Sequence, residues 1–417
     1  MDYRSELETK GKQAKFAARK LATYSSQQKN QALQVMAQAL LDKEAVILVA
    51  NSQDITAGRA KGLSEALLDR LMLDHDRIEA MARGLIELAA LPDPIGETIS
   101  VTQRPNGLEI RQVRVPLGVI AMIYEARPNV TVDAAGICLK TGNAVILRGG
   151  SEAIHSNLAI ASVLKAAALE AGLPEGTIAL IETTDRDAVQ FLLKMNDYLD
   201  VVIPRGGAGL IQTVVKNSTV PVIETGIGVC HTFIDETADL TMAVKIAFNA
   251  KVSRPGVCNA METLLVHEKI ADVFLPAMLQ KYHDAKVELR GCDKTQCYYD
   301  FVKAATEEDW STEYHDYILS VKIVPSIDAA IEHIACYSTG HSEAIVTKDY
   351  FNARRFQHEV DAAAVYVNAS TRFTDGGEFG FGAEIGISTQ KLHARGPMGL
   401  KEMTSTKYLI DGEGQIR

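Results

Sequence analysis

The spacing of hydrophobic and polar positions changes along the chain and predicts three kinds of region. Over roughly the first 90 residues, apolar side chains recur every three or four positions, which predicts amphipathic helices. The pair Ser25-Ser26 and, later, Ser64 stand where N-caps are expected. A further apolar stripe over residues 78–91 ends at Pro92. The amino-terminal region is therefore predicted to be helical.

Residues 99–115 alternate between polar and apolar side chains around Pro105-Asn106-Gly107, which predicts a β-hairpin. The tail, residues 404–416, alternates again and can join the hairpin strands. The hairpin is long and polar, so we expect it to pair with something beyond its own domain.

From residue 117 onward, short apolar strands alternate with helices, which predicts parallel sheets with both faces covered. Ser151 is expected to cap a long helix that ends near residue 171. Near residue 225 the series of strands and helices starts again. The expected strands are 119–124, 144–147, 178–181, 201–203, 220–223, 229–234 and 318–324, and the later helices are 239–250 and 327–336.

The composition narrows the possible functions. A chain of 417 residues is too long for one core, so two or three domains are expected. The net charge of −10 argues against a nucleic-acid-binding protein. The chain begins without a signal-like apolar segment and contains no apolar run of the roughly 18 residues needed to span a bilayer. Its six cysteines form no C-x-x-C pair, so we expect no metal site and no redox pair. Reduced thiols, together with the missing signal and the missing span, predict a cytoplasmic location.

Cys258 is the strongest candidate for chemistry. It follows an Arg-Pro-Gly turn and precedes an apolar run, residues 264–266, that is expected to be a strand. A thiol on such a loop can be partly exposed and rigidly held, as a nucleophile requires. The alternative is a small buried hydrophobic residue, which is what most free cysteines are.

Two joints between a strand and a helix combine an arginine with glycines. They are Arg148-Gly149-Gly150-Ser151 and Arg205-Gly206-Gly207. A guanidinium beside backbone amides suits a phosphate or a ribose. The chain has neither a P-loop nor a G-x-G-x-x-G fingerprint, so ordinary turns with surface arginines are the alternative.

The order of elements and several motifs resemble the aldehyde dehydrogenase superfamily, over nearly the whole chain. Within that superfamily, Gly-His-Ser-Glu at 340–343 is similar to the branch that reduces gamma-glutamyl phosphate. The other motifs that carry the resemblance are Val-Pro-Leu-Gly-Val-Ile at 115–120, Glu-Ala-Arg-Pro-Asn at 125–129, Gly-Asn-Ala-Val-Ile-Leu-Arg at 142–148, Val-Ile-Glu-Thr-Gly-Ile-Gly at 222–228 and Ser-Arg-Pro-Gly-Val-Cys at 253–258.

This resemblance implies an aldehyde dehydrogenase-like α/β fold in three parts. Residues 1–98 and 117–225, with about 370–398, correspond to an NADPH-binding domain with a parallel sheet. Residues 226–369 correspond to an α/β catalytic domain that carries Cys258. Residues 99–116 and 399–417 correspond to oligomerisation strands, so at least a homodimer is expected.

The resemblance also implies roles for individual residues. Cys258 is the nucleophile, and its backbone N–H and the Asn129 side chain stabilise the oxyanion. Arg148 contacts the adenosine ribose or its 2′-phosphate. Ser151 falls where NAD-preferring relatives carry a glutamate, which favours NADPH, although a shift of one residue would place Glu152 there. The remaining residues of the implied cofactor site are Gly149, Arg205, Gly206 and Glu224.

The implied reaction is the NADPH-dependent reduction of L-glutamyl 5-phosphate to L-glutamate 5-semialdehyde through a Cys258 thioester, the second step of proline biosynthesis. Arg127, Arg205 and Arg254 are the candidate cations for the substrate's phosphate and carboxylate. His341 and Glu343 either contact the amino-acid end of the substrate or cap the strand that follows them.

Glu224 falls where aldehyde-oxidising relatives carry the glutamate that activates water, so an ordinary aldehyde dehydrogenase is one alternative. A cysteine hydrolase or acyltransferase without nicotinamide is another, and a non-catalytic binding protein is the last. In the reductase, Glu224 is kept away from the thioester or simply caps the next glycine turn. A transient partnership with the glutamate 5-kinase that makes the labile acyl phosphate is also expected.

Overall fold

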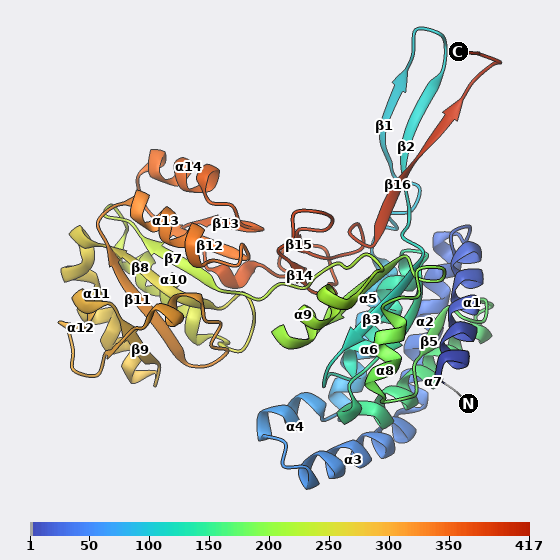
Figure 1. The fold of residues 1–417 in the computed structure, drawn as a ribbon, viewed down its shortest axis with the longest axis horizontal. Coiled ribbons are helices and arrows are strands. Elements are labelled where there is room, and N and C mark those ends of the chain that lie inside the picture. Colours follow the sequence, from blue (N-terminus) through green and yellow to red (C-terminus); the bar gives the residue numbers. More distant parts are fainter. Residues whose placement is uncertain (1–2) are drawn as a thin grey trace. The chain divides into compact units, whose positions relative to one another are not determined.

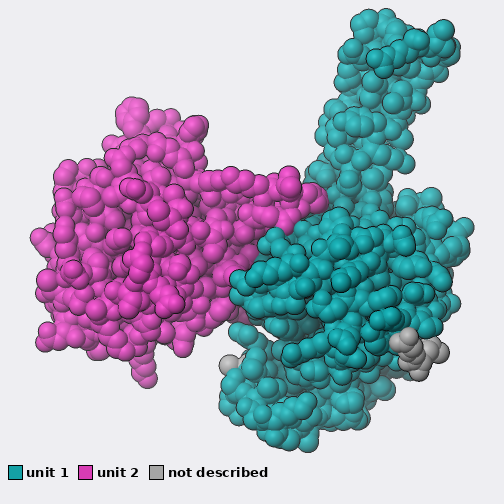
Figure 2. Space-filling view, viewed as in Figure 1, with its two compact units in different colours: residues 1–225, 380–386, 398–417 teal, residues 226–379, 387–397 magenta. Residues whose placement is uncertain are grey.

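The computed structural model describes residues 3–417, which divide into two compact units (Figure 2). Unit 1 comprises the chain up to Thr225 together with Gly380–Gly386 and Met398–Arg417. Unit 2 comprises Gly226–Phe379 and Ile387–Pro397. The sequence assigned the whole of about 370–398 to the first domain, but most of this stretch packs with unit 2. It does so because side chains near residue 259 hydrogen-bond to it.

Within the described residues, unit 1 contains a parallel sheet of four strands in the order β5-β4-β3-β6. All six residues of β3 are buried, as expected for a strand covered on both faces. Helices α1, α6 and α7 contact this sheet. The strands are β3 (Val119–Tyr124), β4 (Ala144–Arg148), β5 (Ile178–Leu180) and β6 (Val201–Arg205).

The helices of unit 1 confirm the predicted helical amino terminus. Ser25 caps α2 through a capping box with Gln28, and Ser64 caps α4. The helices are α1 (Tyr3–Leu21), α2 (Ser26–Asp42), α3 (Glu44–Ala60), α4 (Glu65–Leu71), α5 (His75–Ala90), α6 (Asn129–Lys140), α7 (Ile154–Glu170), α8 (Arg186–Leu192) and α9 (Ala208–Asn217).

Two local predictions for unit 1 were wrong. Ser151 does not cap α7, because a 3₁₀ turn, η1 (Ser151–Ala153), precedes the helix. Residues 220–223 do not form a regular strand, because only Val222 bridges to Val202 of β6. A short 3₁₀ turn and an isolated bridge are features that hydrophobic spacing alone does not reveal.

The predicted hairpin is present and is joined by the carboxy-terminal tail. Strand β2 (Glu109–Pro116) pairs antiparallel with β1 (Thr98–Gln103) on one side and β16 (Thr404–Asp411) on the other. Gly107 supplies the positive φ that the turn requires. The three-stranded sheet projects from the rest of unit 1 (Figure 1).

Unit 2 contains, within the described residues, a seven-stranded parallel sheet in the order β10-β9-β11-β8-β7-β12-β13. Side chains alternate between its two covered faces: Ile234 packs with α10 and α11, and Phe233 packs with α13 and α14. Its strands are β7 (Cys230–Ile234), β8 (Met261–His267), β9 (Glu288–Gly291), β10 (Lys303–Ala304), β11 (Ile318–Val324), β12 (Ser342–Val346) and β13 (Ala364–Val367).

The predicted helices 239–250 and 327–336 and strand 318–324 of unit 2 are confirmed as α10, α13 and β11. The helices and short elements are α10 (Leu240–Val252), α11 (Glu268–Asp284), α12 (Asp293–Gln296), α13 (Ile327–Tyr337), α14 (Tyr350–Glu359), the 3₁₀ turns η2 (Glu307–Ser311) and η3 (Thr371–Phe373), and the strand pair β14 (Ile387–Ser388) and β15 (Gly396–Pro397).

None of the helices in residues 3–417 is both long enough and apolar enough to cross a lipid bilayer.

Candidate active site

Cys258 lies in a turn directly before β8, where its side chain is partly exposed and forms no disulfide. The turn is closed by the Ala260 N–H, which donates to the Val257 carbonyl over 3.0 Å. From β7, the Cys230 thiol donates to the Cys258 carbonyl over 3.2 Å. The backbone at Cys258 is therefore held both locally and by a neighbouring strand.

Gly228 packs directly against the same carbonyl. A Cβ added to Gly228 would lie 1.5 Å from the Cys258 carbonyl oxygen, so no larger residue fits without moving the turn. The Gly228 N–H donates to a carboxylate oxygen of Glu313 over 2.9 Å, which fixes the glycine in place. The local sequence identifies Cys258, but only the tertiary structure shows that Gly228 and Glu313 support it.

Cys230 is close to Cys258 but has a different chemical character. It is fully buried, and burial raises its pKa well above the ordinary thiol value, with the charge of Glu343 acting in the same direction. A protonated thiol can donate a hydrogen bond but is a poor nucleophile. Of these two cysteines, the structure therefore favours Cys258 as the reactive one.

Lys251 and Glu262, which lie on either side of Cys258 in the sequence, form a buried ion pair. Lys251 Nζ at the end of α10 donates to Glu262 on β8 over 2.6 Å, and both side chains are fully buried. Burial lowers the pKa of Lys251 and raises the pKa of Glu262 to about 7. The pair ties the helix before Cys258 to the strand after it.

His341 and Glu343, which were predicted to contact the substrate, lie in the interior of unit 2 and are fully buried. One oxygen of Glu343 accepts from the His231 backbone N–H over 2.8 Å and lies 3.1 Å from His231 Nδ1. Its other oxygen accepts from Ser338. His341 Nδ1 lies 2.8 Å from the Ser342 hydroxyl. This geometry favours a supporting role beneath the site over direct contact with the substrate.

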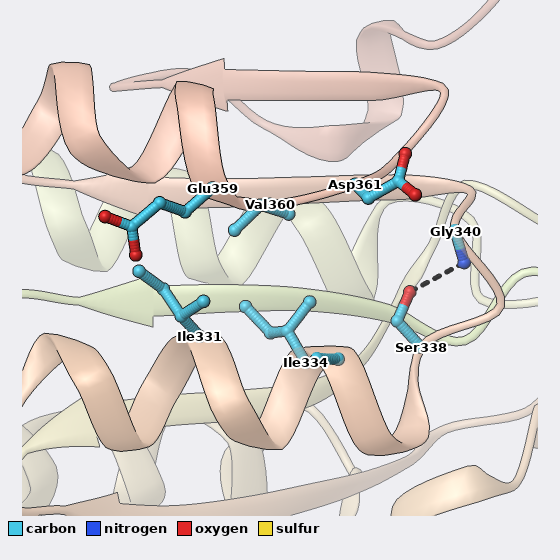
Figure 3. A pocket seen from close by; sticks show the side chains of 8 residues that line it. Ile331, Ile334, Ser338, Gly340, Glu359, Val360 and Asp361 are labelled. Atoms are coloured by element: carbon cyan, nitrogen blue, oxygen red, sulfur yellow. Dashed lines mark hydrogen bonds between the residues drawn. The ribbon is translucent and has the colours of Figure 1, made fainter.

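A hollow between α13 and α14 does not suit an anionic substrate (Figure 3). Apolar side chains such as Ile331 and Ile334 line it together with Glu359 and Asp361, and its lining includes no basic residue. Ser338, which also lines it, accepts from the Gly340 N–H over 2.8 Å. The lining offers no cation to bind a phosphate, so this hollow is not a candidate substrate site.

In unit 1, three of the predicted residues come together in one hollow. Arg127, Asn129 and Arg205 line it, together with Asp133 and Glu384. The strands β3 and β6 end here, at the edge of the sheet where ligands of α/β proteins usually bind. The Asn129 amide donates to Asp133 over 3.0 Å, which orients this side chain at the start of α6.

Arg148 lies at the end of β4, in the joint that the sequence predicted to hold the cofactor. Its guanidinium donates to the carbonyls of Gly149 (2.8 Å) and Thr184 (3.1 Å), and its buried Nε has no hydrogen-bond partner within residues 3–417. Burial lowers the pKa of Arg148, Glu152 opposes this shift, and the neighbouring Arg186 adds to it. Arg186 was not predicted, because it lies on α8, outside the joint.

The two glycine joints differ in how open they are. A Cβ on Gly149 would lie 2.0 Å from the Asn157 side-chain nitrogen, so the backbone there is tightly packed. At the second joint, the Gly207 N–H donates to Glu125 over 2.9 Å. A carboxylate already occupies that amide, so we consider the Arg148 joint the better candidate for a bound phosphate.

Glu224 directly precedes Thr225, the last residue before the chain enters unit 2. The Thr225 hydroxyl donates to the Pro204 carbonyl over 2.8 Å, which anchors this end of the segment to β6. Cys258 and Arg254 lie in unit 2, whereas Glu224, Asn129 and Arg148 lie in unit 1.

The comparison with known families supports the resemblance. A model of the aldehyde dehydrogenase family matches residues 4–297, which is more than half of the chain. The chain belongs to the aldehyde dehydrogenase family. The predicted family and the aldehyde dehydrogenase-like α/β fold are thereby confirmed. Enzymes of this family use a nicotinamide cofactor.

Within the aldehyde dehydrogenase family, the chain is similar to enzymes named gamma-glutamyl phosphate reductase. The enzyme from Moorella thermoacetica is 64% identical over 417 residues, 100% of both chains. The enzyme from Heliobacterium modesticaldum is 65% identical over 413 residues, 99% of each chain. The crystal structure of the gamma-glutamyl phosphate reductase from Thermotoga maritima matches with a TM-score of 0.97 at 51% identity, covering 99% of this chain and 100% of that one.

Proposed function

We propose that this chain reduces L-glutamyl 5-phosphate to L-glutamate 5-semialdehyde and inorganic phosphate, with NADPH as the reductant. This reaction is the second step of proline biosynthesis from glutamate. The observation that carries the proposal is the partly exposed thiol of Cys258, which forms no disulfide and lies on a rigid turn. The full-length identity of 64% to a gamma-glutamyl phosphate reductase supports the choice of substrate.

In the first half of the reaction, the Cys258 thiolate attacks the γ-carbonyl carbon of the substrate. The bond from that carbon to the phosphate oxygen breaks, the phosphate leaves with the electron pair, and a thioester remains on Cys258. The Cys258 backbone N–H and the Asn129 amide are the proposed donors to the oxyanion. A thiolate suits both this attack and its later departure.

In the second half, bound NADPH supplies the hydride that reduces the thioester carbonyl. Arg148, Gly149, Ser151 and Arg186 would hold this cofactor. The orphaned Arg148 Nε and the tight glycine joint fit a phosphate-bearing group. The resulting hemithioacetal then collapses and returns the thiolate to Cys258.

Water must be kept away from the thioester, because hydrolysis would waste the substrate. Glu224 is therefore proposed not to act as a base. We also propose that Lys251, Glu262 and Glu343 position the nucleophile, because each is fully buried within hydrogen-bonding distance of another protein group.

The cellular setting is part of the proposal. The β1-β2-β16 sheet is proposed to pair subunits in a homo-oligomer, since each of its outer strands is paired with β2 alone within the described residues. The acyl phosphate is labile, so a glutamate 5-kinase is the proposed transient partner. A cytoplasmic location suits catalysis by a free thiol.

The test is phosphate-dependent reduction of NADP⁺ with glutamate 5-semialdehyde. We expect wild type to require phosphate and Cys258→Ser to lose at least about 10³-fold in kcat/KM, because an unactivated hydroxyl is a much weaker nucleophile than a thiolate. Cys297→Ser, which removes an exposed thiol, is the control and should retain activity. Oxidation without phosphate would indicate an ordinary aldehyde dehydrogenase, and an active Cys258→Ser would exclude the proposed nucleophile.

A further inference from the structure

Two arginines accompany the nucleophile in unit 2, and one of them was not predicted. Arg254 precedes Cys258 in the same turn, and Arg372 belongs to η3. Neither forms an ion pair within the described residues, in contrast to Arg290 and Arg355 of the same unit, which each bind carboxylates. Cations that the protein itself leaves without a carboxylate are candidates for binding an anionic ligand.

Arg372 is held beside the Cys258 turn by hydrogen bonds at both ends of that turn. The Thr371 hydroxyl donates to the Asn259 carbonyl over 2.7 Å. The Asn259 amide donates back to the carbonyls of Arg372 (3.3 Å) and Thr374 (2.9 Å). At the other end, Arg372 Nε donates to the Ser253 hydroxyl over 3.2 Å. Asn259 is adjacent to Cys258, so η3 is fixed directly to the nucleophile segment.

The charges around Arg372 are unbalanced. Burial lowers the pKa of Arg372 and the nearby Arg254 lowers it further, while negative charge on Cys258 or Asp375 favours the guanidinium. Asp375 accepts instead from the backbone N–H groups of Gly377 (2.8 Å) and Glu378 (3.3 Å). Two neighbouring guanidinium groups repel each other, and an anion between them would remove that cost.

We infer that Arg372 and Arg254 form a phosphate site beside Cys258 and that Arg372 contacts the phosphoryl group of the acyl phosphate. The inference rests on the proposed function. When Cys258 attacks, the phosphate oxygen takes the electron pair of the broken C–O bond and gains negative charge. Two guanidinium groups stabilise that charge. In the reverse direction, the same site binds inorganic phosphate before it attacks the thioester.

The inference is tested by Arg372→Gln in the phosphate-dependent oxidation of glutamate 5-semialdehyde. Losing a charge-assisted contact should raise the KM for phosphate by about 10- to 100-fold. The KM values for NADP⁺ and the aldehyde should remain within about twofold of wild type, because the site contacts neither. The KM for phosphate of Arg372→Lys should lie between those of wild type and Arg372→Gln, since lysine keeps the positive charge but lacks the planar guanidinium with its paired N–H donors. Arg354→Gln, an exposed arginine on α14, is the matched control.

A binding measurement without turnover complements the kinetics. Inorganic phosphate should protect Cys258 of wild type from iodoacetamide, and the phosphate concentration that gives half protection should rise by about 10- to 100-fold in Arg372→Gln. If wild type needs phosphate but Arg372→Gln has the same KM for phosphate and the same half-protecting concentration as wild type, the phosphate site is overturned and the proposed function stands. A wild type that turns over without phosphate would overturn the proposed function itself. A thermal melt equal to wild type confirms that the variant is folded.

Discussion

At the scale of the residue, the site depends on groups that never touch a substrate. Gly228 leaves room for the Cys258 carbonyl, and the Cys230 thiol donates to that carbonyl. Burial raises the pKa of Cys230, so its protonated thiol serves as a hydrogen-bond donor, and Cys258 remains the proposed nucleophile. The contacts of the Cys258 backbone carbonyl therefore fix the position of the Cys258 thiol as much as the contacts of the side chain do.

Gly228→Ala tests this dependence on backbone position. The added methyl group would overlap the Cys258 carbonyl oxygen, so the turn must move by about an ångström or more. We expect kcat/KM to fall at least about 10²-fold, because misplacement of this size in a nucleophile is costly. Steady-state kinetics and the iodoacetamide reaction rate of Cys258 measure the effect. Gly209→Ala has open space around the new Cβ and is the control; equal activity of the two variants would contradict the argument.

The residues of the site were predictable to different degrees. Cys258 stands in a short motif whose turn and strand are encoded next to each other, so the sequence identifies it. Arg372 and Arg186 have no such local signal, because each reaches the site through an element distant in the chain. Glu343 belongs to a recognisable motif, but the motif does not indicate how deeply the side chain is buried. In the structure Glu343 is fully buried.

At the scale of the element, capping residues and apolar spacing predicted most of the helices and strands. Residues 119–124 and 318–324 were predicted with the bounds that β3 and β11 have. Both strands are flanked by turns and have side chains that pack on two covered faces. Their nearly continuous apolar sequence therefore indicates where each strand begins and ends. The errors at Ser151 and residues 220–223 occur where a 3₁₀ turn and one isolated bridge replace regular structure.

Two glycines, one inside a helix and one just after a helix, give opposite predictions for the stability of their alanine variants. Gly84 lies inside α5 with open space at its Cβ, so Gly84→Ala should stabilise the protein by about 0.5–1 kcal/mol through helix propensity. Gly142 follows α6 with a φ of +72°, and its Cβ would lie 2.9 Å from Pro116. Gly142→Ala should therefore destabilise by at least about 1 kcal/mol. Thermal melts at one scan rate measure the melting temperatures, which should fall in the order Gly84→Ala, wild type, Gly142→Ala. The reverse order would refute this explanation.

At the scale of the whole molecule, the chain closes its three-stranded sheet with its last strand. The pairing of β16 with β2 joins residues that are about 300 positions apart, as in the hydrogen bond from Arg111 to Asp411. The sheet exposes large apolar side chains, among them Tyr408 and Ile410 on one face of β16. Exposed apolar residues on a sheet with two open outer strands are typical of a surface that binds another subunit.

Ile410→Lys tests this proposed subunit surface. A charge on the exposed apolar side of β16 should weaken self-association at least about tenfold, because the ammonium group would have to be desolvated on pairing. Sedimentation velocity over a range of protein concentrations measures the change. Ser405→Lys adds the same charge to the opposite face of β16 and should leave the assembly intact. An unchanged assembly in Ile410→Lys would show that this face does not pair subunits.

The sequence alone determined the features that depend on neighbouring residues: the capped helices, the alternating strands, the hairpin turn at Gly107 and the cysteine before β8. These follow from backbone sterics, hydrogen bonding and hydrophobic spacing over a few positions. Only the tertiary structure decided which side chains meet. The Asn259–Arg372 contact spans 113 residues, and residues 370–379 pack with unit 2 because of such contacts. Burial and long-range hydrogen bonds arise when distant segments pack together, and no local pattern encodes them.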